Sequence, residues 1–424
     1  MGKDLRKISI KLRVSVGFLL LIGLAVTYQN CGPTGGSGFN ITLASSGIGN
    51  GTINNTIQAT NKFALAYLHS CAITATGGVQ CWGDGSGGQL GYGSVIAYST
   101  TPVTVINLPA PVTKITTGYY SLTSNPNAPT ETSFNCALLV NGAVYCWGDD
   151  TYGQLGNGQT STSTASPVAA TVEQNFVYDI ATSAGTTCAV LKTGVIQCWG
   201  SNNYGELGNG TNTSSAAATS VLGITNAVSI SAGNNDFCAT LSTGQVNCWG
   251  WNGSGQLGNQ TDTESLNPIA VTGVSSAKRA VGGNVESCAL MLGGTVSCWG
   301  DNTYGELGDG NTTATLAITP VINITGVTDL SVGQWSACAL IGGAIDCWGY
   351  NGLGDLGDGG VTSTSIPTAV SHITTAVAIG SGAFHSCAYL SSGGVDCWGY
   401  NYSGQLGNGT LSNSAVPVVV TGFN

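Results

Sequence analysis

The fold is decided by a stretch near the C-terminus, residues 385–407, which reads HSCAYLSSGGVDCWGYNYSGQLG. It holds two cysteines, a Trp-Gly pair directly after the second one, and a glycine-rich segment ending in Gly-x-Leu-Gly. This pattern occurs seven times, about every 50 residues, which is a period typical of β-propellers. The cysteine pairs are Cys71 and Cys81, Cys136 and Cys146, Cys188 and Cys198, Cys238 and Cys248, Cys288 and Cys298, Cys338 and Cys347, and Cys387 and Cys397. We therefore predict an all-β, seven-bladed β-propeller with four-stranded antiparallel blades.

Each repeat contains four segments with the properties of strands. The first is an apolar segment such as Val228–Ser231, and the second begins at the first cysteine. The third is Gly-x-Val-x-Cys-Trp-Gly, and the fourth is a run such as Pro417–Val420, whose proline suits a strand start or an edge. The second and third segments are close enough to form a tight hairpin.

The hairpin brings the two cysteines of a repeat together. If Cys71 opposes Cys81, then Ile73 opposes Val79, and all four side chains share one face while Trp82 points to the other. Directly opposed Cα atoms lie about 4.5 Å apart, within disulfide range. Repeat six is one residue shorter, but its cysteines can still oppose each other around the turn at 341–344. We predict seven intra-blade disulfides, formed in an oxidising compartment. Zinc is the weaker alternative, because it needs four ligands and the repeat supplies two.

The two ends of the propeller occupy adjacent points of the repeat. The first strand begins near Phe63, and residues 421–424 match the place where another first strand would start. We expect the N- and C-termini to close the ring, with an N-terminal strand completing the blade that the C-terminus begins. Closure leaves no exposed sheet edge.

The N-terminal residues are typical of an exported bacterial protein. A basic segment precedes the apolar run Val14–Val26, which is too short for a comfortable transmembrane helix, so we assign residues 1–30 to a signal peptide. A short uncleaved membrane anchor is the alternative. Cys31 is the one cysteine outside the repeats, and its position resembles the lipid-modified first residue of a bacterial lipoprotein; a free cysteine near the cleavage site is the other interpretation. Residues 31–61 form a flexible Gly/Ser/Thr/Asn linker, and residues 62–424 form the propeller.

Charge limits the class of partner. The 424-residue chain has a formal net charge of −10, and five of its ten basic residues lie in the first 13 positions. Removal of residues 1–30 leaves five basic residues against nineteen acidic ones, a net charge of −14. Such a surface repels nucleic acid phosphates and anionic lipid, so we expect no nucleic-acid partner and membrane contact through a lipid anchor only.

The repeat resembles that of the regulator-of-chromosome-condensation family. His385–Ala388 and Gly394–Gly407 show the likeness best, and it extends over all seven copies. The resemblance implies a seven-bladed propeller. The founding eukaryotic member is an exchange factor for the GTPase Ran and binds chromatin, but this acidic, cysteine-rich chain lacks a basic tail, so we do not expect exchange activity. A secreted bacterial relative binds β-lactamase through one propeller face, which suits an extracytoplasmic chain better.

Aromatic residues are concentrated in the loops of one predicted face. Strand alternation places the loops between first and second strands, and between third and fourth strands, at the same end of the ring. Repeat two has its surplus residues in the first of these loops, between Gly118 and Cys136. The candidate binding residues are Tyr119, Tyr120, Phe134, Tyr152, Tyr204, Phe237, Trp251, Tyr304, Trp335, Tyr350, Phe384, Tyr400 and Tyr402. Exposed aromatic rings favour binding, although rings in propeller loops also pack against neighbouring blades.

Residues that recur in every repeat are more simply explained by structure. We expect the Trp of Cys-Trp-Gly to pack between blades, and the glycines of Gly-x-Leu-Gly to adopt special backbone angles. His69 and His385 share one repeat position and are expected to be structural, while His372 stands alone. The segments 301–303 and 309–311 contain Asp but lack the spacing of a calcium loop. No catalytic constellation is evident, so we predict no enzyme activity, no metal and no cofactor.

These observations leave two hypotheses. The first is a monomeric, exported protein-binding scaffold, anchored by lipid at Cys31, at the outer membrane of the cell envelope. The second is a propeller that binds or hydrolyses glycans or polysaccharides with the same aromatic face, as an envelope hydrolase or lyase would. A secreted protein without an anchor, or a passive structural protein of the envelope, are further alternatives. The partner, protein or glycan, is not identified by the sequence.

Overall fold

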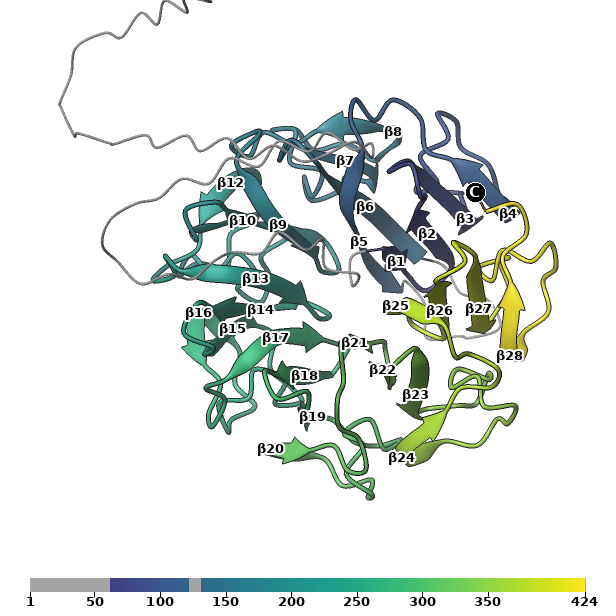
Figure 1. The fold of residues 1–424 in the computed structure, drawn as a ribbon. Coiled ribbons are helices and arrows are strands. Elements are labelled where there is room, and N and C mark those ends of the chain that lie inside the picture. The colour runs from purple at the N-terminus through teal and green to yellow at the C-terminus, as the bar shows by residue number, and fades with distance from the viewer. Residues whose placement is uncertain (1–61, 122–130, 424) are drawn as a thin grey trace, which may run out of the picture. The chain divides into compact units, whose positions relative to one another are not determined.

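The computed structural model describes residues 62–121 and 131–423, and these residues form seven sheets of four antiparallel strands each. The sheets follow one another around a ring (Figure 1). Within the described ranges there is no helix, and hence none that is long and apolar enough to cross a membrane. The predicted signal peptide, Cys31 and the linker lie outside the described residues.

Each blade is built from four consecutive strands. Blade 1 holds β1 (Phe63–Leu65), β2 (His69–Ile73), β3 (Val79–Asp84) and β4 (Tyr98–Thr104). Blade 2 holds β5 (Val112–Ser121), β6 (Glu131–Leu139), β7 (Val144–Asp149) and β8 (Ser163–Ala169). Blade 3 holds β9 (Val177–Thr182), β10 (Thr186–Leu191), β11 (Ile196–Gly200) and β12 (Ser215–Ser220). Blade 4 holds β13 (Ala227–Ala232), β14 (Asp236–Leu241), β15 (Val246–Gly250) and β16 (Ser265–Ala270). Blade 5 holds β17 (Ala277–Gly282), β18 (Glu286–Met291), β19 (Val296–Gly300) and β20 (Thr315–Pro320). Blade 6 holds β21 (Asp329–Val332), β22 (Ser336–Ile341), β23 (Ala344–Gly349) and β24 (Thr364–Ala369). Blade 7 holds β25 (Ala376–Ser381), β26 (His385–Leu390), β27 (Val395–Gly399) and β28 (Ser414–Val419).

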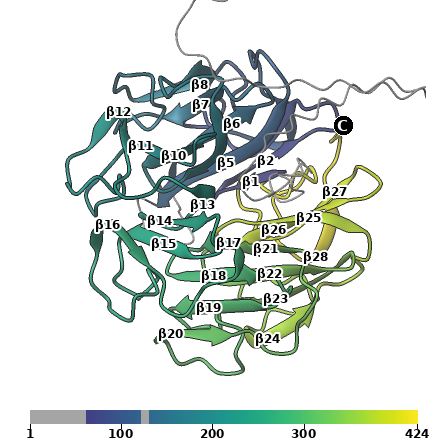
Figure 2. The same cartoon turned by 60° about the vertical axis from the view of Figure 1, so that its left-hand side comes forward.

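The first strand of each blade lies at the centre of the ring. Each contacts the first strands of both neighbouring blades, and β1 contacts both β5 and β25. The remaining strands follow outward in chain order, as β17 to β20 show (Figure 2).

The two faces of a blade pack against different neighbours. In blade 1, Cys71, Ile73, Val79 and Cys81 contribute to a core shared with blade 2. Trp82 faces the opposite way, into a core shared with blade 7. The predicted alternation is therefore confirmed, and it explains why the repeat needs apolar residues on both faces of its hairpin.

A hydrogen bond joins each Trp of the Cys-Trp-Gly sequences to the preceding blade. The indole Nε1 donates to the backbone oxygen of the residue before the Leu of that blade's Gly-x-Leu-Gly. The seven bonds are Trp82 to Gln405 (2.8 Å), Trp147 to Gln89 (2.8 Å), Trp199 to Gln154 (2.9 Å), Trp249 to Glu206 (2.8 Å), Trp299 to Gln256 (2.8 Å), Trp348 to Glu306 (2.7 Å) and Trp398 to Asp355 (2.9 Å). The last Gly of the motif allows this approach: at Gly156, with φ +69°, a Cβ would lie 2.3 Å from Trp199 Nε1.

The seven predicted disulfides are all present. Their Cα–Cα distances are 4.0–4.1 Å, as expected for directly opposed residues. Repeat six accommodates its shorter spacing with a two-residue turn at Gly342 and Gly343, whose φ angles of 59° and 94° suit a type I′ hairpin. Seven disulfides suggest an oxidising, extracytoplasmic environment.

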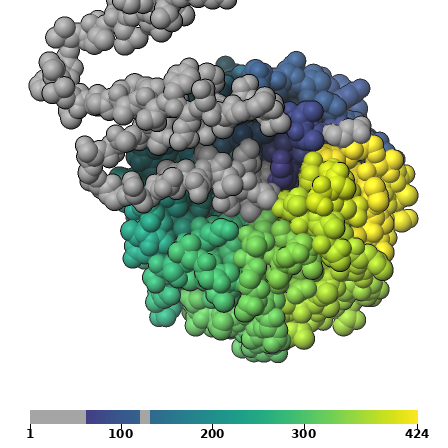
Figure 3. All heavy atoms as spheres, in the orientation of Figure 1, coloured from purple at the N-terminus to yellow at the C-terminus, as the bar shows by residue number. Residues whose placement is uncertain are grey.

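The ring closes between blade 7 and blade 1 without an exchange of strands. Our expectation that an N-terminal strand completes the last blade was wrong, because among the residues that the structure describes β25 to β28 form a four-stranded sheet and β1 pairs only with β2. Instead the closure is made by packing. Phe423 contacts Trp82 and Tyr389, with ring centroids 6.1 Å and 5.9 Å apart, and Ser70 Oγ lies 2.7 Å from His385 Nε2. In the space-filling view the yellow last blade lies against the purple first blade (Figure 3).

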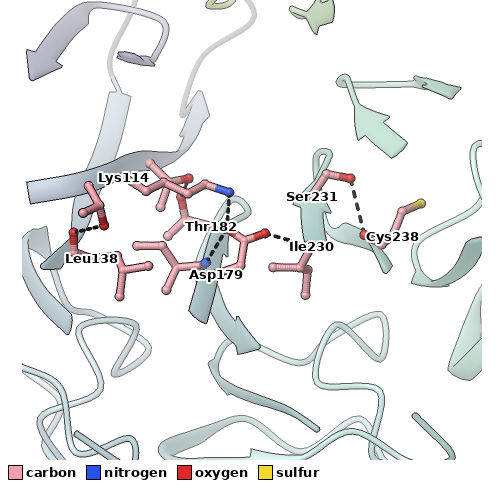
Figure 4. A network of polar contacts seen from close by, with 10 residues as sticks. Lys114, Leu138, Asp179, Thr182, Ile230, Ser231 and Cys238 are labelled. Atoms are coloured by element: carbon pink, nitrogen blue, oxygen red, sulfur yellow. Dashed lines mark hydrogen bonds and ion pairs between the residues drawn. The ribbon is translucent and has the colours of Figure 1, made fainter. Parts of the chain in front are cut away.

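Polar networks join neighbouring inner strands. Lys114 Nζ on β5 donates to Asp179 Oδ1 on β9 at 2.6 Å, and Asp179 Oδ2 accepts the amide of Ile230 on β13 at 3.0 Å (Figure 4). Arg279 and Asp329 form the corresponding ion pair between β17 and β21. Each pair is mostly buried, so it serves to fix the spacing of the blades rather than to present charge.

A candidate interaction face

The long hairpin of blade 2 distinguishes one end of the ring. The surplus residues of repeat two extend β5 and β6, which stay in register up to the pair Ser121 and Glu131. Strand β7 pairs with β6 only from Phe134 onward. The predicted loop is therefore a two-stranded ribbon at its base, which extends beyond the blade's other strands at the end where the loops between first and second strands lie.

The predicted binding residues divide into buried and exposed groups. Phe134 and Phe237 are fully buried, so they support the blades and offer no surface to a partner. Phe237 stacks on Trp249, with centroids 6.0 Å apart. The rings that are exposed by a third or more are Tyr152 (37%), Tyr204 (39%), Tyr304 (37%) and Tyr402 (56%). Tyr119, Tyr120, Trp251, Trp335 and Tyr350 are half-buried, while Phe384 and Tyr400 are buried.

Six of the predicted residues form a continuous row with one residue that the sequence did not single out. We define the aromatic strip as Tyr304, Trp335, Tyr350, Phe384, Tyr400, Tyr402 and Tyr67, which lie in loops of blades 5, 6, 7 and 1. Successive ring centroids are 5.1–6.4 Å apart: Tyr304 to Tyr350 5.1 Å, Tyr304 to Trp335 5.6 Å, Trp335 to Phe384 5.2 Å, Phe384 to Tyr400 6.4 Å, Tyr67 to Phe384 5.2 Å and Tyr400 to Tyr402 6.3 Å. These distances suit edge-to-face and offset ring packing. The strip therefore combines a buried base with an exposed edge.

The other predicted residues lie at or beyond the ends of the strip. Tyr119 packs against the buried cluster that contains Tyr67 and Phe384. Tyr120 contacts Tyr152 of the same blade, with ring centroids 6.4 Å apart. Tyr204 and Trp251 belong to blades 3 and 4. The repeat pattern did not point to Tyr67, because it lies four residues before its cysteine, whereas Trp335 and Phe384 lie three residues before theirs.

Buried carboxyl groups lie in the loops that carry the strip. The side chain before the Leu of Gly-x-Leu-Gly folds back onto its own loop in most blades. Glu306 Oε2 accepts the amide of Tyr304 at 2.8 Å, and Asp355 Oδ2 accepts the amide of Leu353 at 3.1 Å. The second oxygens, Glu306 Oε1 and Asp355 Oδ1, are buried and have no hydrogen-bond partner in the described part of the chain. Burial raises the pKa of both carboxyls to about 7, and the charge of Asp301 adds to the effect at Glu306.

Glutamine at the same repeat position makes an additional bond in blades 1 and 2. Gln89 Nε2 donates to Asp84 and Gln154 Nε2 donates to Asp149, both at 2.5 Å. In blade 5 an acceptor, Glu306 Oε1, replaces this donor, while the residue equivalent to Asp149 is again an acid, Asp301. In blades 1 and 2 a glutamine donates to an aspartate at this place, whereas in blade 5 two carboxyl groups, Glu306 and Asp301, take these positions.

Structural contacts account for His69, His385 and the aspartate loops. His69 Nε2 lies 3.2 Å from Asn135 Oδ1, and burial lowers the pKa of His385 to about 3. Asp309 Oδ1 accepts the amide of Asn311 at 3.1 Å, as in a local turn. Among the described residues, no group of three or more His, Cys, Asp or Glu side chains is placed to hold a metal ion.

A ring of seven four-stranded blades, joined by a Trp-to-loop bond at each interface, defines a seven-bladed β-propeller with one aromatic face. Two models of the regulator of chromosome condensation (RCC1) repeat match the chain, over residues 141–190, 243–290, 343–389 and 392–424 and over 67–89, 177–206, 227–256 and 376–405. Together they cover more than half of it, and the chain belongs to the RCC1 repeat family.

Similar proteins share either a segment or the fold. The human E3 ubiquitin-protein ligase HERC2 is 29% identical over 147 residues, which are 34% of this chain and 3% of the ligase. The probable human E3 ubiquitin-protein ligase HERC6 is 31% identical over 141 residues, 33% of this chain and 12% of that protein. The chain thus spans a small part of these relatives. Among solved structures, Prp20p from Saccharomyces cerevisiae superimposes with a TM-score of 0.70 at 18% identity, covering 87% of this chain and 89% of that one. Human WBSCR16 also gives 0.70, at 19% identity, with 81% and 94% covered.

Proposed function

We propose that this protein is an exported, lipid-anchored bacterial propeller that acts as a protein-binding scaffold at the cell envelope. The observation that carries the proposal is the aromatic strip, a row of rings with a buried base and an exposed edge, held by a rigid ring of blades that each contain one disulfide. Tyr and Trp supply large contact area with little loss of side-chain entropy, and they are enriched at the centres of protein interfaces. A propeller of this family needs no catalytic group to serve such a role.

The proposed location follows from three features taken together. The seven disulfides require an oxidising compartment, residues 1–30 have the pattern of a signal peptide, and Cys31 is the cysteine left outside the seven pairs. Metabolic labelling with a tritiated fatty acid tests the anchor. We expect label on the wild-type chain and none on Cys31→Ala; equal labelling of both would remove the anchor from the proposal.

Site-specific photo-crosslinking in intact cells tests the scaffold role. A benzoylphenylalanine placed at Tyr304 or Tyr402 is expected to capture a protein. The same group at Tyr178 serves as the matched control and is expected to capture none. Tyr178 is 44% exposed and lies near the start of β9, at the end of the strand opposite the loop that leads to β10. Capture from Tyr178 alone would contradict the assignment of this face. A carbohydrate adduct at Tyr304 or Tyr402 would favour the glycan-binding alternative instead.

A further inference from the structure

The aromatic strip lies in a region without cations. The described residues include five basic side chains, and none belongs to the loops of blades 5 to 7 that carry the strip. Lys114 and Arg279 are held in ion pairs on inner strands. Lys278 donates to Thr328 O, Lys192 donates to Asn175 O, and Lys62 lies over the ring of Tyr389. The face of the strip is therefore formed by π-electron surfaces and acidic groups.

Buried carboxyl groups lie close to the rings of the strip, since Glu306 and Asp355 are 0% and 1% exposed. Glu306 is two residues from Tyr304 and is bonded to its amide. Asp355 is close enough to Tyr350 for its charge to raise the pKa of that phenol, after the larger effect of burial. Glu286, fully buried in blade 5, has its Oε1 without a partner in the described residues, as Glu306 has. Because these oxygens are buried, the carboxyl groups act on the surface through their negative charge and not through hydrogen bonds to a partner.

We propose that the aromatic strip binds a basic segment of a partner protein, whose Arg or Lys side chains stack on Tyr304, Trp335 and Tyr350 beside the carboxylates of Glu306 and Asp355. Guanidinium and ammonium groups stack on aromatic faces, and the negative charge of the buried carboxylates attracts them without direct contact. An acidic segment would meet repulsion at the same place. This inference rests on the proposed scaffold function and adds the chemistry of its partner.

Fluorescence anisotropy with a labelled, end-capped hexa-arginine peptide tests the inference on the full-length oxidised protein at 150 mM salt. We expect the peptide to bind and a hexaglutamate peptide not to bind. Trp335→Ala and Tyr304→Ala are each expected to weaken hexa-arginine binding by about ten-fold, because each removes a stacking face. Glu306→Gln is expected to weaken it by about three-fold through loss of the charge.

Tyr204→Ala is the matched control. Tyr204 has the same repeat position as Tyr304, similar exposure and an equivalent acid, Glu206, whose Oε2 accepts the Tyr204 amide at 2.8 Å, but it is not a member of the strip. We expect it to change the affinity by less than two-fold. Equal losses in Tyr204→Ala and Tyr304→Ala would show diffuse attraction to an acidic protein and overturn the inference.

Two further outcomes are decisive. If Trp335→Ala does not fold, Tyr304→Ala alone decides the matter, since its side chain is partly exposed. Failure of hexa-arginine to bind, with proteins still captured by crosslinkers at Tyr304, would overturn the basic-partner inference and leave the scaffold function standing. If hexa-arginine does not bind and no protein is captured at Tyr304, both the basic-partner inference and the scaffold function are overturned.

Discussion

At the scale of single residues, the Trp of each Cys-Trp-Gly is the main link between blades. Its ring fills the interface, and its Nε1 donates to the loop of the preceding blade. The sevenfold recurrence of this residue predicts its packing role. The recurrence does not predict the acceptor, since the bond joins residues at least 42 positions apart through a loop whose shape is set by glycines.

We expect Trp299→Phe to lower the free energy of unfolding by about 1–3 kcal/mol. The phenyl ring leaves the Gln256 carbonyl without its donor and opens a small cavity. Equilibrium denaturation in guanidinium chloride under oxidising conditions measures the effect. The control is Trp251→Phe, at a half-exposed tryptophan outside the motif, which should change stability by less than about 0.5 kcal/mol. Similar losses in the two variants would contradict the role of the indole bond.

The buried carboxyl groups predict a protein that is more stable in weak acid. The pKa of Glu306 is raised from 4.5 to about 7 in the folded state, mainly by burial. Between these two values the folded protein holds a proton that the unfolded chain has lost. The stabilising contribution is therefore complete below about pH 4.5 and is lost as the pH rises through 7. The raised pKa of Asp355 acts in the same direction.

Glu306→Gln should weaken this pH dependence. The carboxamide does not ionise, and its Nε2 can donate to the loop as in Gln89 and Gln154. We expect thermal melts to show a smaller fall in Tm between pH 5 and pH 8 than in the wild type, and a gain of roughly 1 kcal/mol at pH 8. Asp262→Asn, at an exposed loop position, is the control and should leave the slope unchanged. Parallel curves for wild type and Glu306→Gln would refute the assignment.

At the scale of elements, the hairpins were predictable in detail, whereas the insertion in repeat two was not. Cysteine spacing and period-two alternation determine a register such as Cys188 opposite Cys198. The insertion, with Pro126 and Pro129, resembled a plain loop, but its two ends continue the strands. Local sequence does not show whether a hairpin extends past its sheet, because this depends on pairing between distant residues.

Burial of the loop aromatics follows from their distance to the first cysteine. Phe134 lies two residues before Cys136, the position held by the buried His69 and His385, and Phe237 lies one residue before Cys238. Both positions are already inside the second strand. Trp335 and Phe384 lie three residues before their cysteines, in the loop. The number of residues between an aromatic residue and the first cysteine therefore distinguishes scaffold residues from those of the strip. That the rings of different blades meet in one row follows only from the closed ring.

We expect the projecting part of the β5–β6 hairpin to be dispensable for folding. Replacement of residues 120–132 by Asn-Gly should keep Phe134 opposite Gly148 and change the free energy of unfolding by less than about 1 kcal/mol. A deletion that also removes Phe134 should lower the free energy of unfolding by about 3–5 kcal/mol, because the side chain of Phe134 is fully buried. Denaturation curves of the two deletions measure the contrast, and equal stability would contradict the boundary we assign.

At the scale of the whole molecule, the ring is closed by contacts that repeat at every interface. The bond from Trp82 to Gln405 joins the first and last blades as the other six join consecutive ones. The repeat count predicted seven blades, but the mode of closure depends on whether a strand crosses between the first and last sheets. The same repeat permits either arrangement, so this feature required the structure.

Because blades 7 and 1 are each complete sheets, we expect that the chain can be cut at another connection between blades once its present ends are joined. Eight residues, 221–228, separate Ser220 at the end of β12 from Ser229 on β13, and the next two inner strands are preceded by connections of equal length. Joining Asn424 directly to Ala59 would place eight residues, 420–424 and 59–61, between Val419 and Lys62, whose backbone oxygen accepts the Ile73 amide at the position equivalent to Ser229. A circular permutant with this junction, opened between Thr272 and Gly273, would keep every blade contiguous.

We expect this permutant to fold with all seven disulfides and with a free energy of unfolding within about 2 kcal/mol of a chain that begins at residue 59, since linking and cutting exchange connections of similar length. Disulfide mass mapping and guanidinium denaturation provide the measurements. The informative comparison is a permutant with the same junction that is opened between Ser242 and Thr243, inside the hairpin of β14 and β15. This opening removes the short turn that aligns Cys238 with Cys248, so we expect slower oxidation of that pair and a larger loss of stability. If both permutants were equally stable and equally oxidised, blade continuity would not be what holds the ring together, and the disulfides and Trp bonds alone would suffice.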